Sequence, residues 1–140
     1  MRLLVTGGAG FIGSAFVRRR LAACPEDRIT VLDKLTYAGN RTNLAAVETD
    51  PGLATRCRFV LGDIADPDAV RPLIVEADAV VNFAAESHVD RSILDAGAFL
   101  RTGVTGVHVL LEATLAAQAQ RAPTDPPIRF LQVSTDEVYG

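Results

Sequence analysis

The sequence is poor in several residue types on which small proteins often depend. It has no tryptophan, one methionine and two cysteines in 140 residues, and 6% of its residues are aromatic. Cys24 and Cys57 form no Cys-x-x-Cys pair and lie near no suitably spaced histidine, so we expect two buried, reduced thiols and no metal site. The formal net charge is only -3, which gives no electrostatic reason to expect a nucleic acid or an anionic membrane as a partner.

Long apolar runs are absent as well. No stretch reaches the roughly 18 apolar residues of a membrane span, and glycines at 7, 8, 10 and 13 interrupt the apolar start of the chain. We therefore expect a soluble, cytoplasmic protein. Hydrophobic residues make up 49% of the chain and charged residues 22%, which is enough for one packed domain over residues 1–140.

Short apolar runs alternate along the chain with segments of helical pattern. The runs lie at 3–5, 29–32, 58–61, 79–83 and 128–133. Continuous apolar runs of this length are typical of strands that are buried on both faces. Helices are expected at 11–23 (apolar at 12, 16, 17 and 21), at 67–75 after Asp66 as N-cap, and from 96 to about 120. This order predicts an α/β fold, a doubly wound parallel sheet of five or so strands with helices on both faces.

The loop after the first predicted strand is rich in glycine. It contains Gly-x-Gly-x-x-Gly at positions 8, 10 and 13, and a second glycine spacing at 7, 10 and 13. Glycine is needed where backbone turns sharply or approaches a pyrophosphate, and the helix that follows offers free N–H groups to the phosphates. A tight turn without a ligand is the alternative. The strand before the loop and the helix after it favour dinucleotide binding.

Asp33 closes the second predicted strand, 20 residues after Gly13. An acidic residue at this place accepts hydrogen bonds from the adenosine ribose hydroxyls and repels a 2′-phosphate, which favours NAD over NADP. The neighbouring Lys34 argues slightly the other way, because a cation tolerates phosphate. A turn-forming aspartate at a strand end is the structural alternative.

The remaining predicted strands also end in small, polar or acidic residues. Asp63 and Ile64 follow the third strand, where they could contact adenine, and Ala84 and Ala85 follow the fourth. A polar segment, 86–92, comes next; its His88 could be structural or functional. Ligands of open α/β sheets bind outside the carboxyl ends of the strands, so the recurrence at five ends predicts a ligand site there.

Five segments together resemble the dTDP-glucose 4,6-dehydratases, a family of extended short-chain dehydrogenase/reductases. They are TGGAGFIG (6–13), LDKLTYAGN (32–40), GDI (62–64), AAESHVDRS (84–92) and STDEVYG (134–140). The first is shared by many nucleotide-sugar enzymes, and the last two are more specific. The resemblance implies a Rossmann-type domain with an NAD site lined by Gly7, Gly10, Phe11, Ile12, Gly13, Asp33, Lys34, Leu35, Thr36, Asp63, Ile64, Phe83, Ala84, Ala85, Ser87 and Thr102.

The same resemblance implies catalytic and substrate-binding residues. Ser87, His88 and Thr135 would contact the dTDP-hexose, Asp136 would be the general acid and Glu137 the general base, with Thr135 beside them. In this family the hexose is oxidised at C4, water is eliminated across C5 and C6, and the hydride returns to C6. Two carboxyls in different environments can hold the different protonation states that this elimination needs. Without the surrounding motif, Asp136 and Glu137 would be interpreted as an acidic turn.

Two features depart from the family pattern. A downstream Tyr-x-x-x-Lys pair and a C-terminal substrate domain are expected, and the 140 residues contain neither. The chain is therefore interpreted as a fragment that binds NAD weakly and does not complete the reaction. Gly103 also stands where the family usually has asparagine, and glycine within a helix costs about 1 kcal/mol relative to alanine.

Two other functions remain open from the sequence. Another nucleotide-sugar enzyme, such as a 4-epimerase, would share the glycines and Asp33 but would not need the Asp136–Glu137 pair. A non-catalytic NAD-binding module would bind the cofactor without the sugar nucleotide. The family resemblance further implies a homodimer formed through two helices of each subunit, one of them at about 96–120.

Overall fold

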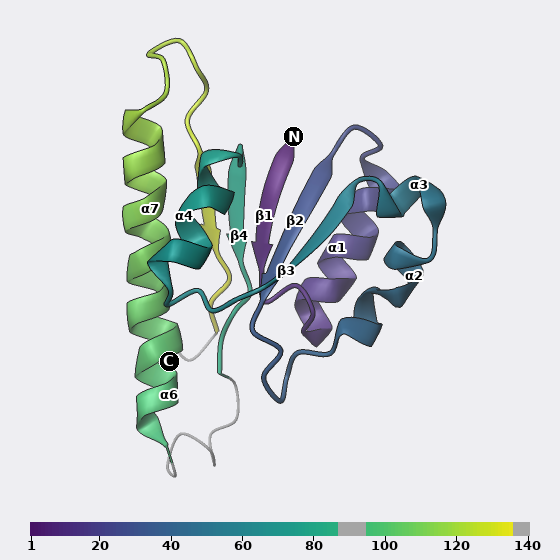
Figure 1. The fold of residues 1–140 in the computed structure, drawn as a ribbon, viewed down its shortest axis with the longest axis horizontal. Helices are drawn as coiled ribbons and strands as arrows, with labels where there is room; N and C mark the ends of the chain where they lie inside the picture. Colours follow the sequence, from purple (N-terminus) through teal and green to yellow (C-terminus); the bar gives the residue numbers. More distant parts are fainter. Residues whose placement is uncertain (87–94, 136–140) are drawn as a thin grey trace.

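The computed structural model describes residues 1–86 and 95–135, which form a five-stranded parallel sheet with helices on both faces (Figure 1). The strands are β1 (Arg2–Thr6), β2 (Arg28–Asp33), β3 (Cys57–Leu61), β4 (Ala79–Asn82) and β5 (Arg129–Gln132). Their order is β3-β2-β1-β4-β5, and every neighbouring pair is parallel. The predicted doubly wound sheet is confirmed, and each strand boundary lies within one residue of the expected one.

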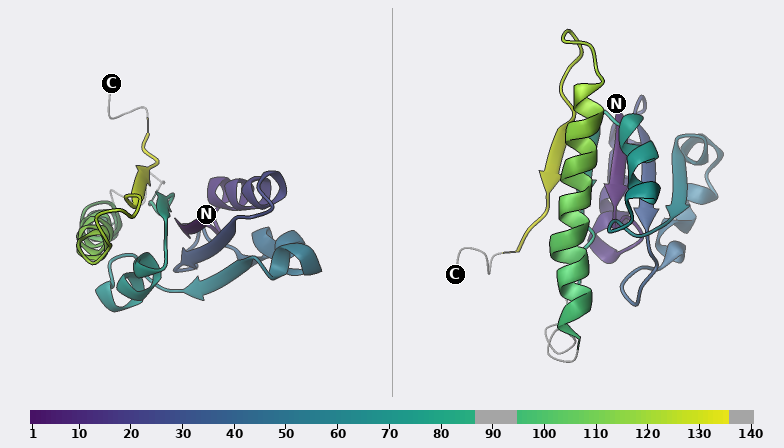
Figure 2. Two further views of the ribbon diagram at one scale, coloured as in Figure 1. Left: turned by 90° about the horizontal axis from the view of Figure 1, so that it is seen from above. Right: turned by 60° about the vertical axis from the view of Figure 1, so that its left-hand side comes forward.

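Two groups of helices enclose the sheet. Helix α1 (Phe11–Ala23) lies on one face, opposite α4 (Pro67–Val75) and α7 (Val107–Ala119) on the other (Figure 2). Between β2 and β3 the chain forms three short helical segments, which complete the core around α1: η1 (Arg41–Leu44), α2 (Ala45–Glu48) and α3 (Pro51–Ala54). The helix α6 (Ala96–Leu100) leads into α7 through the π-helical η2 (Arg101–Gly106).

Alternating side chains of the strands supply the two halves of the core. In β1, Leu3 and Val5 pack in the cluster around α1, whereas Leu4 packs in the cluster around α4 and α7. Because both faces are covered, every position of the strand except Arg2 is buried. The apolar runs of the sequence therefore follow from burial on both sides.

The expected helices are present, with local differences. The N-cap at Asp66 is confirmed, since its carboxylate accepts a hydrogen bond from the Asp68 N–H at 3.0 Å. The helix predicted from 96 to about 120 is helical over 96–119, but its π-helical segment η2 was not foreseen. Ile12 was expected on the buried face of the first helix. It is 63% exposed, and the buried residues of α1 are Gly13, Ser14, Val17 and Leu21.

The expectation of two fully buried thiols is wrong in degree. Cys24 and Cys57 are free, as expected, but both are only half-buried, because each lies at an end of an element rather than inside one. Burial, helped by the charge of Glu48, nevertheless raises the pKa of the Cys57 thiol to about 11. A thiol with so high a pKa is almost entirely protonated, and hence unreactive, at neutral pH.

A buried carboxylate joins the start of the chain to the end of α1. The oxygens of Asp27 accept from the Met1 amino group at 2.7 Å and from the Arg20 Nε at 2.6 Å. Burial alone would raise the pKa of Asp27, but the hydrogen bonds and charges of the two cations outweigh it and hold the pKa below its usual value. The ionised form of Asp27 is thus the form that the fold stabilises.

We expect Asp27→Asn to lower the free energy of unfolding at pH 7 by about 1 to 2 kcal/mol, because charge-assisted hydrogen bonds are lost from a buried site. A folded pKa below the unfolded value of about 3.9 means that the stabilisation is present above that pH and is lost as the pH falls through the folded pKa. Urea unfolding at several pH values tests this. Glu76→Gln is the control, since Glu76 is 66% exposed and 4.0 Å from Arg58. An equal loss in both variants would contradict the prediction.

Candidate functional site: a cavity at the carboxyl ends of the strands

The loops that follow β1, β2, β3 and β4 meet in one cavity at the carboxyl edge of the sheet. Its lining residues are Gly7, Leu32, Asp33, Lys34, Thr36, Gly62, Asp63, Ile64, Ala84, Ala85, Glu86 and Thr102. Most of these were singled out in the sequence; Leu32, Gly62 and Glu86 were not. Thr102 reaches the cavity from η2, so residues nearly a hundred positions apart in the chain come together here.

Glycines 7, 10 and 13 make the sharp turn between β1 and α1. Gly7 has a φ of +66°, and a Cβ on it would lie 2.6 Å from the Ala84 nitrogen. A Cβ on Gly13 would lie 2.3 Å from the Gly7 carbonyl oxygen, which already accepts the Gly10 N–H at 3.1 Å. Side chains at positions 7 and 13 would therefore push backbone atoms apart. The 7-10-13 spacing describes the steric demand of this turn.

The first turn of α1 is free to bind an anion. Gly10 is the N-cap and makes no side-chain capping bond, so the first N–H groups of the helix keep their unfilled hydrogen-bonding capacity. Phe11 and Ile12 in the same turn are 88% and 63% exposed. An uncapped helix start with apolar side chains standing beside it fits a pyrophosphate flanked by the rings of a dinucleotide.

Asp33 has a structural role and faces the cavity as well. Its Oδ2 accepts the Ala9 N–H and its Oδ1 accepts the Leu35 N–H, each at 2.8 Å, while Leu35 itself has a φ of 54°. The carboxylate thus holds the glycine loop and forms a turn after β2. A carboxylate has about four lone-pair positions, so each oxygen of Asp33 retains capacity for a ribose hydroxyl. The structural and functional interpretations of Asp33 are compatible.

Asp63 binds two cations at the edge of the cavity. Its Oδ2 accepts from the Lys34 Nζ at 2.8 Å and from the Arg101 Nε at 3.2 Å, and its Oδ1 accepts the Ala65 N–H at 2.9 Å. Burial opposes ionisation of Asp63, but these partners outweigh it and hold the pKa of the carboxyl below its usual value. Sequence reasoning missed Arg101 because it lies 38 residues from Asp63.

Three adjacent strands end in a row of polar side chains that sequence reasoning also missed. Thr6, Asn82 and Gln132 are in register across β1, β4 and β5. The Thr6 hydroxyl and the Ala84 N–H donate to Asn82 Oδ1, and Asn82 Nδ2 donates to Gln132 Oε1 at 2.8 Å. A polar residue closing each of three apolar runs was the available signal. This row fixes the loop that carries Ala84 over Gly7.

We expect Asn82→Leu, a change of similar size, to lower the free energy of unfolding by about 2 to 3 kcal/mol. The reason is that the buried Thr6 hydroxyl and the Ala84 N–H would lose their acceptor. Denaturant titration measures the effect, and Gln132→Leu is the control because Gln132 is exposed and its loss leaves Asn82 able to bind water. If the two variants lost equal stability, the buried row would not have the importance given to it here.

The predicted catalytic segment is only partly described. Ser87, His88, Asp136 and Glu137 lie outside the described residues. Thr135 is exposed and follows the end of β5, on the same edge of the sheet as the cavity. Leu35, Phe83 and the glycines 10 and 13 stand behind the cavity and shape it rather than line it.

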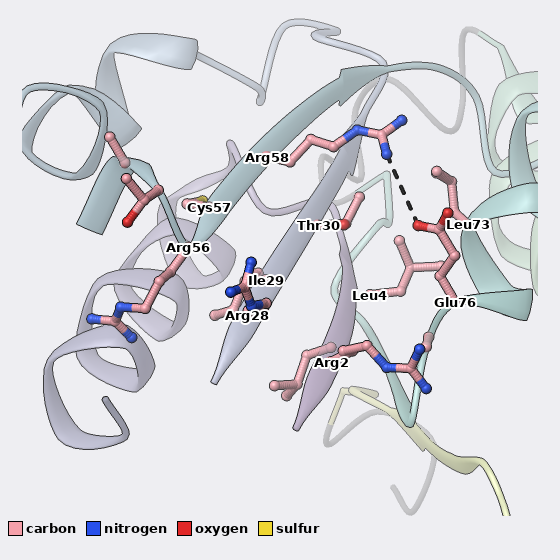
Figure 3. A pocket seen from close by; sticks show the side chains of 14 residues that line it. Arg2, Leu4, Arg28, Ile29, Thr30, Arg56, Cys57, Arg58, Leu73 and Glu76 are labelled. Carbon is pink, nitrogen blue, oxygen red and sulfur yellow. Dashed lines mark ion pairs between the residues drawn. The ribbon is translucent and has the colours of Figure 1, made fainter. Parts of the chain in front are cut away.

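A larger cavity, of about 320 Å³, lies at the opposite end of the strands (Figure 3). Four arginines are among its lining residues, Arg2, Arg28, Arg56 and Arg58. Arg2 bonds a neighbouring aspartate, Arg56 donates to three backbone carbonyls, and Arg58 faces Glu76 at 4.0 Å. Because these charges are largely satisfied within the protein, and the amino ends of strands carry no glycine loop, we do not place the site there.

Two negative findings apply to the described residues, 1–86 and 95–135. No group of three or more histidine, cysteine, aspartate or glutamate side chains there is placed to hold a metal ion. None of the helices in the same ranges is both long and apolar enough to cross a membrane.

An open parallel sheet with a glycine-rich first turn and an acid at the end of the second strand defines a dinucleotide-binding domain. The sequence model of one family, described as GDP-mannose 4,6 dehydratase, matches residues 4–140, and the chain belongs to this family.

Individual relatives point in the same direction. A low-salt glycan biosynthesis protein of Haloferax volcanii is 53% identical over 140 residues, and a dTDP-glucose 4,6-dehydratase of Mycobacterium tuberculosis is 49% identical over 140 residues. All of this chain is covered in both cases, but it spans only 41% and 38% of the lengths of those proteins.

Solved structures share the fold. DesIV, a dTDP-glucose 4,6-dehydratase from Streptomyces venezuelae with NAD bound, has a TM-score of 0.77 and 55% identity over 84% of this chain and 36% of its own. A dTDP-glucose 4,6-dehydratase from Bacillus anthracis in complex with NAD has a TM-score of 0.80 and 39% identity, covering all of this chain and 39% of its own. The similarity includes the whole described sheet.

Proposed function

We propose that this chain is the NAD-binding domain of a dTDP-glucose 4,6-dehydratase. The observation that carries the proposal is the cavity in which the glycine turn, Asp33 and Asp63 meet at the carboxyl edge of the sheet. The uncapped start of α1 would bind the pyrophosphate, Asp33 the adenosine ribose, and Asp63 with Ile64 the adenine. Relatives solved with NAD support the same cofactor here.

The proposed reaction is an elimination of water from the hexose. NAD, when bound, supplies the hydride acceptor that makes a ketone at C4 and so acidifies the C5 proton. Glu137, as a carboxylate, removes that proton, and Asp136, as a neutral acid, protonates the departing C6 hydroxyl. Ser87, His88 and Thr135 bind the sugar nucleotide and keep C5 and C6 within reach of the two carboxyls. These roles are carried over from the family resemblance.

The intact protein should convert dTDP-glucose, in the presence of NAD⁺, to a product that has lost one water and carries a keto group at C4. Mass spectrometry and NMR of the sugar would identify it. A product of unchanged mass with inverted C4 would favour the rival 4-epimerase function, which relatives of similar fold also carry; one is a UDP-glucose 4-epimerase from Thermus thermophilus with 34% identity and a TM-score of 0.69. NAD binding without any turnover would favour a non-catalytic module.

The proposal includes a homodimer formed through the α6–η2–α7 helix. Leu100, Val104, Leu111 and Leu115 recur along it at helical spacing and are 61%, 62%, 42% and 66% exposed. An apolar stripe of this kind on a helix surface marks an association site.

We expect Leu115→Glu to make the intact protein monomeric in sedimentation experiments, because the charge would have to be buried in the helix pair. Val75→Glu is the control, since Val75 is 55% exposed on α4, away from the stripe. A dimer that persists in Leu115→Glu would place the interface elsewhere.

A further inference from the structure

Two cations stand beside Asp33, at the place where the extra phosphate of NADP would lie. Lys34 follows Asp33 directly, and Arg101 comes from the first residue of η2. Both would suit a 2′-phosphate, which is bound by basic side chains near the end of the second strand in NADP enzymes. In this structure both instead bind one oxygen, Oδ2 of Asp63, at 2.8 and 3.2 Å.

The charges of this group cancel. Asp33 and Asp63 contribute two negative charges, and Lys34 and Arg101 contribute two positive ones. Glu86, which lines the same cavity, adds a further negative charge. A phosphate monoester carries roughly -1.5 to -2 at neutral pH, so the group as a whole offers it no net attraction.

The geometry shows which partner of the three is fixed. The Asp63 side chain is 15% exposed and is anchored by the Ala65 N–H, whereas the Lys34 and Arg101 side chains are 52% and 58% exposed. Two long and largely solvated side chains therefore converge on an anchored carboxylate. If Asp63 lost its charge, both cations would be free to turn toward another anion close by.

We propose that Asp63 is a second determinant of NAD selectivity, because it holds the two cations, Lys34 and Arg101, that would otherwise bind the 2′-phosphate of NADP. Asp33 repels the phosphate, and Asp63 removes its binding partners. This inference rests on the proposed NAD-binding function. It predicts that removing the charge of Asp33 alone leaves an enzyme that binds neither dinucleotide well.

The test compares NAD⁺ and NADP⁺ binding by calorimetry in the intact protein and in Asp33→Asn, Asp63→Asn and the double variant. Asparagine keeps the shape of each carboxylate and one acceptor oxygen, and melting temperatures verify folding. Asp33→Asn should weaken NAD⁺ binding about tenfold with little gain for NADP⁺. Adding Asp63→Asn should then tighten NADP⁺ binding about tenfold or more and change NAD⁺ binding much less. Lys34→Gln in the double variant should reverse most of that gain.

Three results would overturn the inference. Asp33→Asn alone could bind NADP⁺ as tightly as the double variant, the double variant could gain equally for both dinucleotides, or Lys34→Gln could leave the gain unchanged. Each would mean that Asp63 does not withhold cations from the phosphate. If the unmodified protein failed to bind NAD⁺ at all, the proposed function would be refuted and the inference with it, whereas normal NAD⁺ binding with no NADP⁺ gain refutes the inference alone.

Discussion

Glu137→Gln and Asp136→Asn are each expected to slow dehydration by about a hundredfold to ten-thousandfold while NAD⁺ binds as before. Glutamine cannot take the C5 proton, and asparagine cannot donate a proton to the departing C6 hydroxyl. Neither side chain is assigned a contact with the cofactor, so cofactor affinity should not change. Turnover of dTDP-glucose, followed by the keto product, and NAD⁺ titration together measure the two effects.

A matched change elsewhere separates chemistry from stability. Glu112→Gln removes a carboxylate from the exposed side of α7, where no role in catalysis is assigned, and should leave turnover unchanged. If Asp136 and Glu137 form only an acidic turn, their variants will resemble Glu112→Gln. Full turnover in either variant would remove that residue from the proposed mechanism.

Gly13→Ala is expected to destabilise the fold by about 3 kcal/mol or more and to abolish measurable NAD⁺ binding. The added Cβ would lie 2.3 Å from the Gly7 carbonyl oxygen and 2.9 Å from the Gly8 Cα. Both are backbone atoms of the turn, so no side-chain rotation can relieve the contact. The start of α1 would have to move away from β1, and the N–H groups proposed to bind the pyrophosphate would move with it.

Gly103→Ala provides the control for Gly13→Ala, since both replace a helical glycine by alanine. A Cβ on Gly103 would meet no heavy atom within 4 Å, whereas one on the nearby Gly106 would lie 2.5 Å from Ile64 Cδ1. We therefore expect Gly103→Ala to stabilise the protein by up to about 1 kcal/mol. Thermal unfolding and NAD⁺ titration measure both variants. Equal behaviour of the two would show that the turn tolerates a side chain at position 13.

Helices α1 and α4 could be predicted to the residue, because a glycine turn and a capping aspartate mark where each begins. The glycine turn and Asp33 could be predicted too, since their chemistry is local. The segment 41–54 could not, because each of its helices has four residues and is too short to show periodicity.

Contacts between distant elements were also beyond the reach of the sequence. Arg101 was one more surface arginine on a predicted helix, and nothing in its neighbourhood indicated Asp63 as a partner. Asn82 stood within an apolar run, but which neighbours it met depended on the strand order and register. Local patterns determine elements, whereas these two interactions depend on which elements become neighbours.

The π-helical η2 makes the length of this helix a sensitive quantity. Each of its i→i+5 hydrogen bonds encloses one residue more than an α-helical bond, so the segment is equivalent to an insertion in an ordinary helix. Deleting one residue between Arg101 and Gly106 would restore regular winding, and it would turn everything before it by about 100° relative to α7. Leu100 would then leave the line of Leu111 and Leu115, and Arg101 would swing away from Asp63. Among homologous chains, a gap at this point of an alignment would therefore mark a change in both subunit pairing and cofactor preference.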